Sequence, residues 1–157
     1  MRNWSPQVID HFSNPRNMGA LPDADVTAEA ANPCCGDRIR LHAHVCGDRI
    51  TDCTFLAYGC AAALAIASLL TEAVAGRDID DLAGFDEDRV AELAGGLGPG
   101  QRHCAVLGRD VLHALSRKHR AGTGSTAAWR RTDLQSVPGS DGLQIRLTKE
   151  RPKGALV

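Results

Sequence analysis

The feature that most constrains the fold is a period-two alternation of apolar and polar residues that starts at Arg38. Over residues 38–45 every second side chain is aliphatic, and the side chains between them are arginine or histidine. This alternation predicts a β-strand with one buried face and one face turned to solvent. Gly47-Asp48 is typical of a hairpin turn, and a return strand is expected from about Ile50 to Ala57. The sequence therefore predicts an antiparallel meander of two or three strands.

Helices are expected on both sides of this meander. A serine N-cap followed by proline opens the first one, whose apolar stripe is Val8, Ile9 and Phe12. The Ala- and Leu-rich run after Cys60 has high helix propensity and ends at Gly76, a good C-cap. Together with the meander these segments predict an α+β fold. The four helices are expected at about residues 5–13, 61–75, 87–93 and 105–120.

Two internal stretches and the C-terminal quarter lack a regular pattern. Residues 16–30 are expected to be irregular or to form a weak edge strand, and the glycine-rich residues 95–101 are expected to form an irregular loop. The stretch from residue 121 to residue 157 has few core-forming residues and several Gly, Ser and Pro. We therefore expect one domain of residues 1–120 and a mostly disordered tail of residues 121–157.

The charge distribution supports the same division. Residues 1–116 hold 16 Asp/Glu and 9 Lys/Arg, whereas residues 117–157 hold 3 and 9, so an acidic body carries a basic tail. The basic residues of the tail are spread along it, and Trp129 is its only aromatic residue. We expect no nucleic-acid and no membrane partner from this pattern, because contacts of that kind need clustered basic residues.

Six cysteines suggest metal or redox chemistry rather than a disulfide framework. The N-terminal residues hold no apolar run of signal-peptide length, and the longest apolar stretch, residues 61–70, is about half of a membrane span. We therefore expect a cytoplasmic protein, in which thiols stay reduced. The cysteines are Cys34, Cys35, Cys46, Cys53, Cys60 and Cys104.

Three of these cysteines lie where the predicted backbone structure changes. Cys35 precedes the first long strand, and Cys60 and Cys104 stand at the starts of two helices. A helix N-terminus favours the thiolate, the form that binds metals and attacks persulfide sulfur. Asp37 and His103 add an oxygen and a nitrogen ligand. These five residues could hold one tetrahedral ion or a small cluster, with one ligand to spare.

The remaining cysteines and histidines are given structural roles. Cys46 and Cys53 on the hairpin are expected to pack as small apolar residues. Cys34 is expected to be an inert neighbour of Cys35, although a spare ligand or a redox partner of Cys35 stays open. His42 and His44 are expected to face solvent. Packing or surface roles are expected for His11, His113 and His119.

The order and spacing of several motifs resemble the IscU / NifU N-terminal-domain family of iron–sulfur cluster assembly scaffold proteins. The resemblance covers about residues 4–120. The 43 residues between Cys60 and Cys104, and the histidine before Cys104, resemble the IscU/NifU type more than the SufU branch. The motifs are VIDHFSNPRNMG at 8–19, CGD at 35–37, aromatic-Gly-Cys at 58–60, LTE at 70–72 and HCAVLGRDVL at 103–112.

The resemblance implies a fold, a role and a site. It implies a small antiparallel three-stranded sheet with helices on one face. It implies a scaffold without catalytic turnover that receives sulfur from a PLP-dependent cysteine desulfurase, takes up Fe(II), uses an electron donor, and passes a labile [2Fe–2S] cluster to apo-proteins. The matching cluster cysteines are Cys35, Cys60 and Cys104, with Asp37 and His103 beside them. Cys104 is the expected persulfide acceptor, because a glycine-rich loop precedes it.

Departures from the family pattern concern partners. Leu97-Gly98-Pro99-Gly100-Gln101 replaces the segment that a specialised Hsp70 chaperone recognises, so that chaperone is not expected to bind. Trp4 stands in place of an N-terminal tyrosine, and we expect a monomer or a weak homodimer. The same Asp, His and Cys ligands suit Zn(II), so a zinc-bound sulfur acceptor of a desulfurase is the alternative function.

Overall fold

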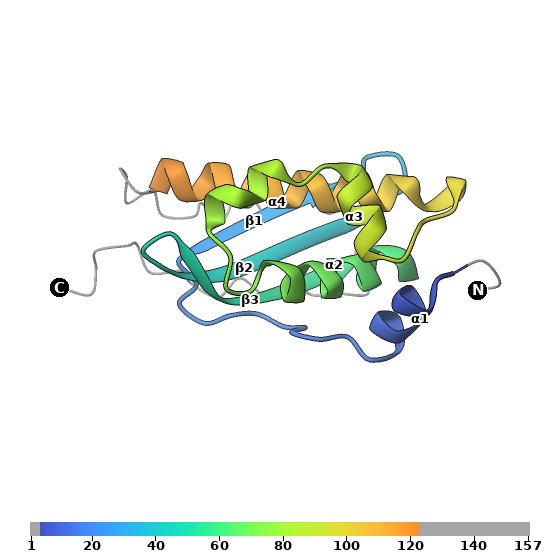
Figure 1. The fold of residues 1–157 in the computed structure, drawn as a ribbon, viewed down its shortest axis with the longest axis horizontal. Helices are drawn as coiled ribbons and strands as arrows, with labels where there is room; N and C mark the ends of the chain where they lie inside the picture. The colour runs from blue at the N-terminus through green and yellow to red at the C-terminus, as the bar shows by residue number, and fades with distance from the viewer. Residues whose placement is uncertain (1–3, 123–157) are drawn as a thin grey trace.

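The computed structural model describes residues 4–122 and has the predicted α+β architecture. Within these residues no helix combines the length and the apolar character that crossing a membrane requires. The α-helices and strands follow one another as Figure 1 shows: α1 (Pro6–Ser13), β1 (Val26–Ala31), β2 (Arg38–Cys46), β3 (Arg49–Tyr58), α2 (Ala61–Val74), α3 (Glu87–Leu93) and α4 (Arg102–Gly122). Two 3₁₀-helices precede α3 and α4: η1 (Ile79–Gly84) and η2 (Pro99–Gln101).

The three strands form one antiparallel sheet in the order β1-β2-β3. Leu41 of the central strand lies opposite Ala28 of β1 and Phe55 of β3. The β2–β3 hairpin is the one that the alternation predicts, with a register shift between His44 and Val45. Residues 16–30 were expected to be irregular or to form a weak edge strand. Strand β1 forms at the end of this stretch.

The long helices cover one face of this sheet, as the resemblance implies. Helix α4 lies over β1, helix α2 lies over β3, and the two helices pack against each other (Figure 1). Gly108 of α4 lets both α2 and α3 approach closely, because a Cβ at this position would lie 3.0 Å from side-chain atoms of Ile66 in α2 and Val90 in α3. The N-terminal ends of α2 and α4 carry two of the predicted site cysteines, Cys60 and Cys104.

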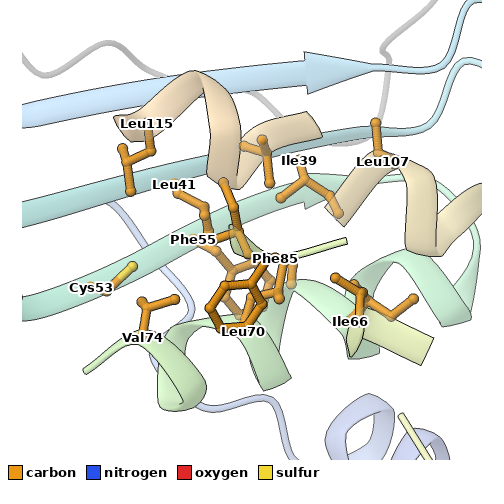
Figure 2. Packing of buried hydrophobic residues seen from close by; sticks show 14 of the residues in the cluster. Ile39, Leu41, Cys53, Phe55, Ile66, Leu70, Val74, Phe85, Leu107 and Leu115 are labelled. Atoms are coloured by element: carbon orange, nitrogen blue, oxygen red, sulfur yellow. The ribbon is translucent and has the colours of Figure 1, made fainter. Parts of the chain in front are cut away.

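The core lies between the sheet and the two long helices. Figure 2 shows Ile39, Leu41 and Phe55 of the sheet gathered with Ile66 and Leu70 of α2, all of them buried. Burying each such side chain contributes about 1.5–3 kcal/mol relative to leaving it exposed. The aliphatic residues of β2 therefore pack into the core, on the strand face that the alternation predicts to be buried.

The polar half of the pattern does not face solvent as predicted. Arg40 is 2% exposed and His42 is 4% exposed. Both lie opposite polar residues of β1 and bond to them: Arg40 Nη2 donates to Glu29 Oε2 at 2.5 Å, and His42 Nδ1 lies 2.9 Å from Thr27 Oγ1. Burial, with the Arg40 charge adding to it, lowers the pKa of His42 to about 4. The prediction of a solvent-facing His42 is therefore wrong, because paired polar side chains can be buried.

The stripe predicted for the first helix is also wrong in part. Ser5 caps α1, with its Oγ accepting a hydrogen bond from Val8 N at 3.1 Å, as predicted. Val8 and His11 are buried, whereas Ile9 and Phe12 are each 38% exposed. The helix packs through the Val8 and His11 side because His11 Nδ1 lies 2.8 Å from Ser68 Oγ of α2.

The C-terminal part of the domain is more regular than predicted. Residues 99–101 of the expected irregular loop form η2, which leads directly into α4 at Arg102. Cys104 therefore lies inside the first turn of α4 rather than ahead of it. Residues 121 and 122 complete α4, whereas the rest of the predicted disordered tail lies outside the described residues.

Candidate metal centre

Three segments that are distant in sequence meet at one end of the molecule. They are the β1–β2 loop, the turn from β3 into α2, and the first turn of α4 (Figure 1). One ligand atom each from Asp37, Cys60, His103 and Cys104 lies within 4.8 Å of all the others. The topology therefore brings together four of the five predicted site residues.

The β1–β2 loop delivers Asp37. Asn32 N donates to Asp37 O at 2.8 Å, which closes the base of the loop, and Gly36 N donates to Asn32 O at 2.8 Å. The side chain of Asn32 accepts from Cys34 N at 2.9 Å. These bonds satisfy the backbone of a tight six-residue loop, and they leave the Asp37 carboxylate buried at the start of β2.

Cys60 is held against that carboxylate by the preceding glycine. Cys60 N donates to Asp37 Oδ1 at 3.2 Å, and Cys60 is the N-cap residue of α2. Gly59 has φ +148°, and a Cβ there would lie 2.4 Å from Asp37 Oδ1. Only glycine fits both the backbone conformation and the close approach. Gly59 is a positioning residue that the sequence analysis missed, and its place directly before Cys60 was the available signal.

The first turn of α4 supplies the other two side chains. Cys104 Sγ lies 3.5 Å from Cys60 Sγ and 3.3 Å from His103 Nε2. His103 Nε2 in turn lies 3.5 Å from Asp37 Oδ2. The four side chains thus form a compact group in which each contacts at least one other.

The donor set suits one transition-metal ion. Two thiols, one imidazole and one carboxylate are the ligand types of four-coordinate zinc, and thiolates also bind iron in clusters. Asp37 Oδ2 is a buried oxygen that accepts no hydrogen bond from the residues that the structure describes. A bound cation would satisfy this oxygen, and buried polar atoms of this kind need a partner.

Cys35, the fifth predicted residue, is not part of the four-residue group. Its thiol is exposed on the β1–β2 loop beside Cys34, which is also exposed. The charge of Cys35 nevertheless acts on Cys104, and the charge of Cys60 acts on Cys35, so the thiol is near the group. Its role as a ligand stays a prediction.

The pKa values of the two neighbouring thiols, Cys60 and Cys104, shift in opposite directions. A hydrogen bond from Cys104 lowers the pKa of the Cys60 thiol to about 6. That same bond, together with burial, raises the pKa of Cys104 far above its usual range. Because Cys60 is exposed and Cys104 is buried, we expect Cys60 to be the thiolate of the pair in the metal-free protein.

Alkylation of the metal-free protein tests this assignment. Because the thiolate is the nucleophile, the rate for a peptide thiol with a pKa near 8.5 falls about tenfold per pH unit below that value. Between pH 8 and pH 6.5 we expect the iodoacetamide rate at Cys60 to change much less, and Cys104 to remain unmodified. Peptide mass spectrometry measures both rates. A Cys60 rate that parallels the peptide thiol would contradict the assignment.

A pocket of about 210 Å³ opens beside His103. It lies between the β1–β2 loop and α4, so it borders the four-residue group on the side of the imidazole. Its lining residues are Ala31, Asn32, Pro33, His103, Val106, Leu107 and Asp110.

The other cysteines and histidines lie away from the group. Cys53 is buried in the core, and burial raises the pKa of its thiol to about 12, which agrees with the predicted packing role. Cys46 is exposed at the end of β2, so the prediction that it packs as an apolar residue is wrong. His113 Nε2 lies 2.7 Å from Phe85 O, and His119 is buried.

Comparison with known proteins identifies the fold family. The family model described as the NifU-like N terminal domain matches residues 3–124, which is most of the chain. The chain belongs to this family. The match confirms the resemblance to this family that the sequence motifs indicated.

Several members of the NifU-like family are similar over most of this chain. The iron–sulfur cluster assembly scaffold protein IscU 1 of Archaeoglobus fulgidus is 42% identical over 109 residues, 69% of this chain and 71% of that protein. The IscU scaffold protein of Aquifex aeolicus is 39% identical over 118 residues, 74% of this chain and 75% of that protein. A crystal structure of a putative scaffold protein for the SUF system from Fervidobacterium islandicum has the same fold, with a TM-score of 0.58 at 22% identity. The match covers 72% of this chain and 96% of that one.

Proposed function

We propose that this chain is a scaffold on which iron–sulfur clusters are assembled and from which they are passed on. The observation that carries the proposal is the convergence of Asp37, Cys60, His103 and Cys104 ligand atoms within 4.8 Å at one end of the fold. Relatives that share 39–42% of their residues with this chain over the matched regions are named as such scaffolds. The role is binding and transfer, without catalytic turnover of a substrate.

Sulfur would arrive as a persulfide on a PLP-dependent cysteine desulfurase, with Cys104 as the acceptor. The Cys104 thiolate attacks the outer sulfur, the sulfur–sulfur bond breaks, and the desulfurase cysteine leaves as a thiolate. His103 Nε2, 3.3 Å from Cys104 Sγ, is placed to take the proton of the Cys104 thiol. Because Cys104 is fully buried, the transfer requires the segment before α4 to open, and the pocket beside His103 is the proposed approach.

Iron would be held by the same residues as cargo. The four-residue group can hold one Fe(II), and a [2Fe–2S] cluster would recruit Cys35 as the third thiolate beside Cys60 and Cys104, with either Asp37 or His103 as the fourth ligand. An external electron donor supplies the reducing equivalents that assembly consumes.

The remaining partners follow from this role. We propose apo iron–sulfur proteins as recipients, the cytoplasm as the compartment, and a monomer or weak homodimer as the working form. Residues 1–120 would constitute the scaffold domain, with the basic residues 121–157 outside it. We expect no specialised Hsp70 chaperone, no nucleic acid and no membrane among the partners.

Anaerobic reconstitution tests the proposal. Purified full chain is incubated with Fe(II), L-cysteine and a cysteine desulfurase, and the visible absorption of a [2Fe–2S] chromophore is followed. We expect the chromophore in the wild type and in Cys46→Ser, and its loss in Cys60→Ala. A colourless wild-type protein in this assay would contradict the scaffold function.

The alternative function is a zinc-bound sulfur acceptor of a desulfurase. The observation that favours it is the donor set itself, since two sulfurs, one nitrogen and one oxygen within reach of one ion complete a tetrahedral zinc site without Cys35. Stoichiometric zinc in a colourless protein that accelerates the desulfurase would favour this alternative. Zinc content alone does not decide, because thiolates that bind clusters also bind zinc.

A further inference from the structure

Cys34 lies near the candidate site, but it belongs neither to the four-residue group nor to the family motif at residues 35–37. It stands next to Cys35 at the tip of the β1–β2 loop, and both thiols are exposed. The bond from Gly36 N to Asn32 O folds residues 33–35 into a single turn, and the Asn32 side chain holds Cys34 N. The loop therefore presents two adjacent thiols immediately before Asp37, which belongs to the metal group.

The scaffold function, on which this inference rests, requires two electrons for each sulfur atom. A persulfide carries its outer sulfur as sulfane sulfur, whereas a cluster contains sulfide. Cys60 and Cys104 could supply the electrons by forming a disulfide, since their Sγ atoms lie 3.5 Å apart. That oxidation would remove both sulfur ligands of the four-residue group. The Cys34–Cys35 pair lies outside the four-residue group, so it can supply the electrons while that group keeps both of its sulfur ligands. Cys35 becomes available as the third cluster thiolate again once the disulfide is reduced.

We propose that Cys34 is a resolving thiol that releases sulfide from a persulfide on Cys35. Sulfane sulfur first moves by thiol–persulfide exchange from Cys104 to Cys35: the Cys35 thiolate attacks the outer sulfur, and the Cys104 thiolate leaves. The Cys34 thiolate then attacks Cys35 Sγ, the bond between that sulfur and the outer sulfur breaks, and hydrosulfide leaves with the bonding electron pair. The two cysteines are oxidised to a disulfide while the sulfane sulfur is reduced to sulfide.

The adjacency of the two cysteines suits a bond that forms only transiently. Neighbouring Cα atoms are 3.80 Å apart across a trans peptide, which is below the usual separation of about 4.4–6.8 Å in disulfides. A disulfide with this deviation is more easily reduced than an ordinary structural one. An external dithiol protein reductant would therefore reopen it readily and return both thiols for the next sulfur atom.

The test follows sulfide release from the full-length, iron-free protein under anaerobic conditions. Protein is loaded with sulfur by a cysteine desulfurase and L-cysteine, or in a parallel arm by sodium trisulfide, and is then freed of small molecules. Released sulfide is assayed over time, and non-reduced peptides are examined by mass spectrometry. The variants are Cys34→Ser and Cys34→Ala, and the matched control is Cys46→Ser, which alters an equally exposed cysteine at the far end of β2.

We expect the wild type and Cys46→Ser to release sulfide and to yield a loop peptide with a Cys34–Cys35 disulfide. Both Cys34 variants should keep the added sulfur on Cys35 and release sulfide at least about tenfold more slowly. Release at the wild-type rate from the Cys34 variants, or a Cys60–Cys104 disulfide in its place, would overturn the inference. Failure of the desulfurase arm alone would contradict sulfur acceptance in the proposed function, and the trisulfide arm would still decide the role of Cys34.

Discussion

Replacing Cys60 with serine should lower the zinc affinity of the chain by more than the roughly 10–100-fold that changes outside a ligand shell cost. Cys60 supplies one of only two sulfur atoms in the four-residue group, and its pKa, lowered to about 6, makes its thiolate available near neutral pH. A hydroxyl at this position is a poor ligand, and three ligands remain. Competition with a chromogenic zinc chelator measures the affinity.

Cys46→Ser is the matched control for this prediction. Cys46 is also exposed, but it lies at the end of β2 and not in the group, so its loss should leave the zinc affinity unchanged. Thermal unfolding of both variants without zinc checks that the fold is retained. Equal zinc affinities for the two variants would show that Cys60 is not a zinc ligand.

Replacing Gly59 with alanine should damage the site without changing any ligand. The new Cβ would lie 2.4 Å from Asp37 Oδ1, so the carboxylate must move and its bond from Cys60 N is lost. The backbone conformation at φ +148° adds strain of about 1–3 kcal/mol for a residue other than glycine. We expect the zinc affinity to fall about 10–100-fold, the range of a misplaced supporting contact. Chelator competition and chemical denaturation measure the two effects.

Gly76→Ala separates backbone strain from the displacement of Asp37. Gly76 also has a positive φ, +77°, but a Cβ at this position would meet no atom within 4 Å, and the residue follows α2 at the opposite end from Cys60. This variant should lose stability by a similar amount and keep its zinc affinity. If both variants bind zinc as the wild type does, Gly59 has no positioning role.

Much of the fold follows from local patterns along the chain. The alternation from Arg38, the hairpin turn and the Ala-rich run after Cys60 each determine structure within a few residues, and the strands and helices form there. The buried Arg40 and His42 could not be predicted in the same way. Their bonding partners Glu29 and Thr27 lie opposite them only after β1 pairs with β2.

Four of the five residues predicted for the candidate site converge in the structure, but their internal order was not predictable from the sequence. Helix starts and motif spacing indicated Cys60, Cys104, Asp37 and His103, and the structure brings their ligand atoms together. The distinction between the exposed Cys60 and the buried Cys104 depends on how α4 begins. Because η2 leads into α4 at Arg102, Cys104 lies within the first turn and faces the core.

The most direct test of the central claim is the ligand set of the bound metal. X-ray absorption spectroscopy of the zinc-loaded full chain counts sulfur and lighter ligands separately. The arrangement of Asp37, Cys60, His103 and Cys104 predicts two sulfur ligands and two nitrogen or oxygen ligands. The spectrum should be unchanged in Cys35→Ser. A zinc site with three sulfur ligands, or one that loses a sulfur ligand in Cys35→Ser, would contradict the four-residue ligand set.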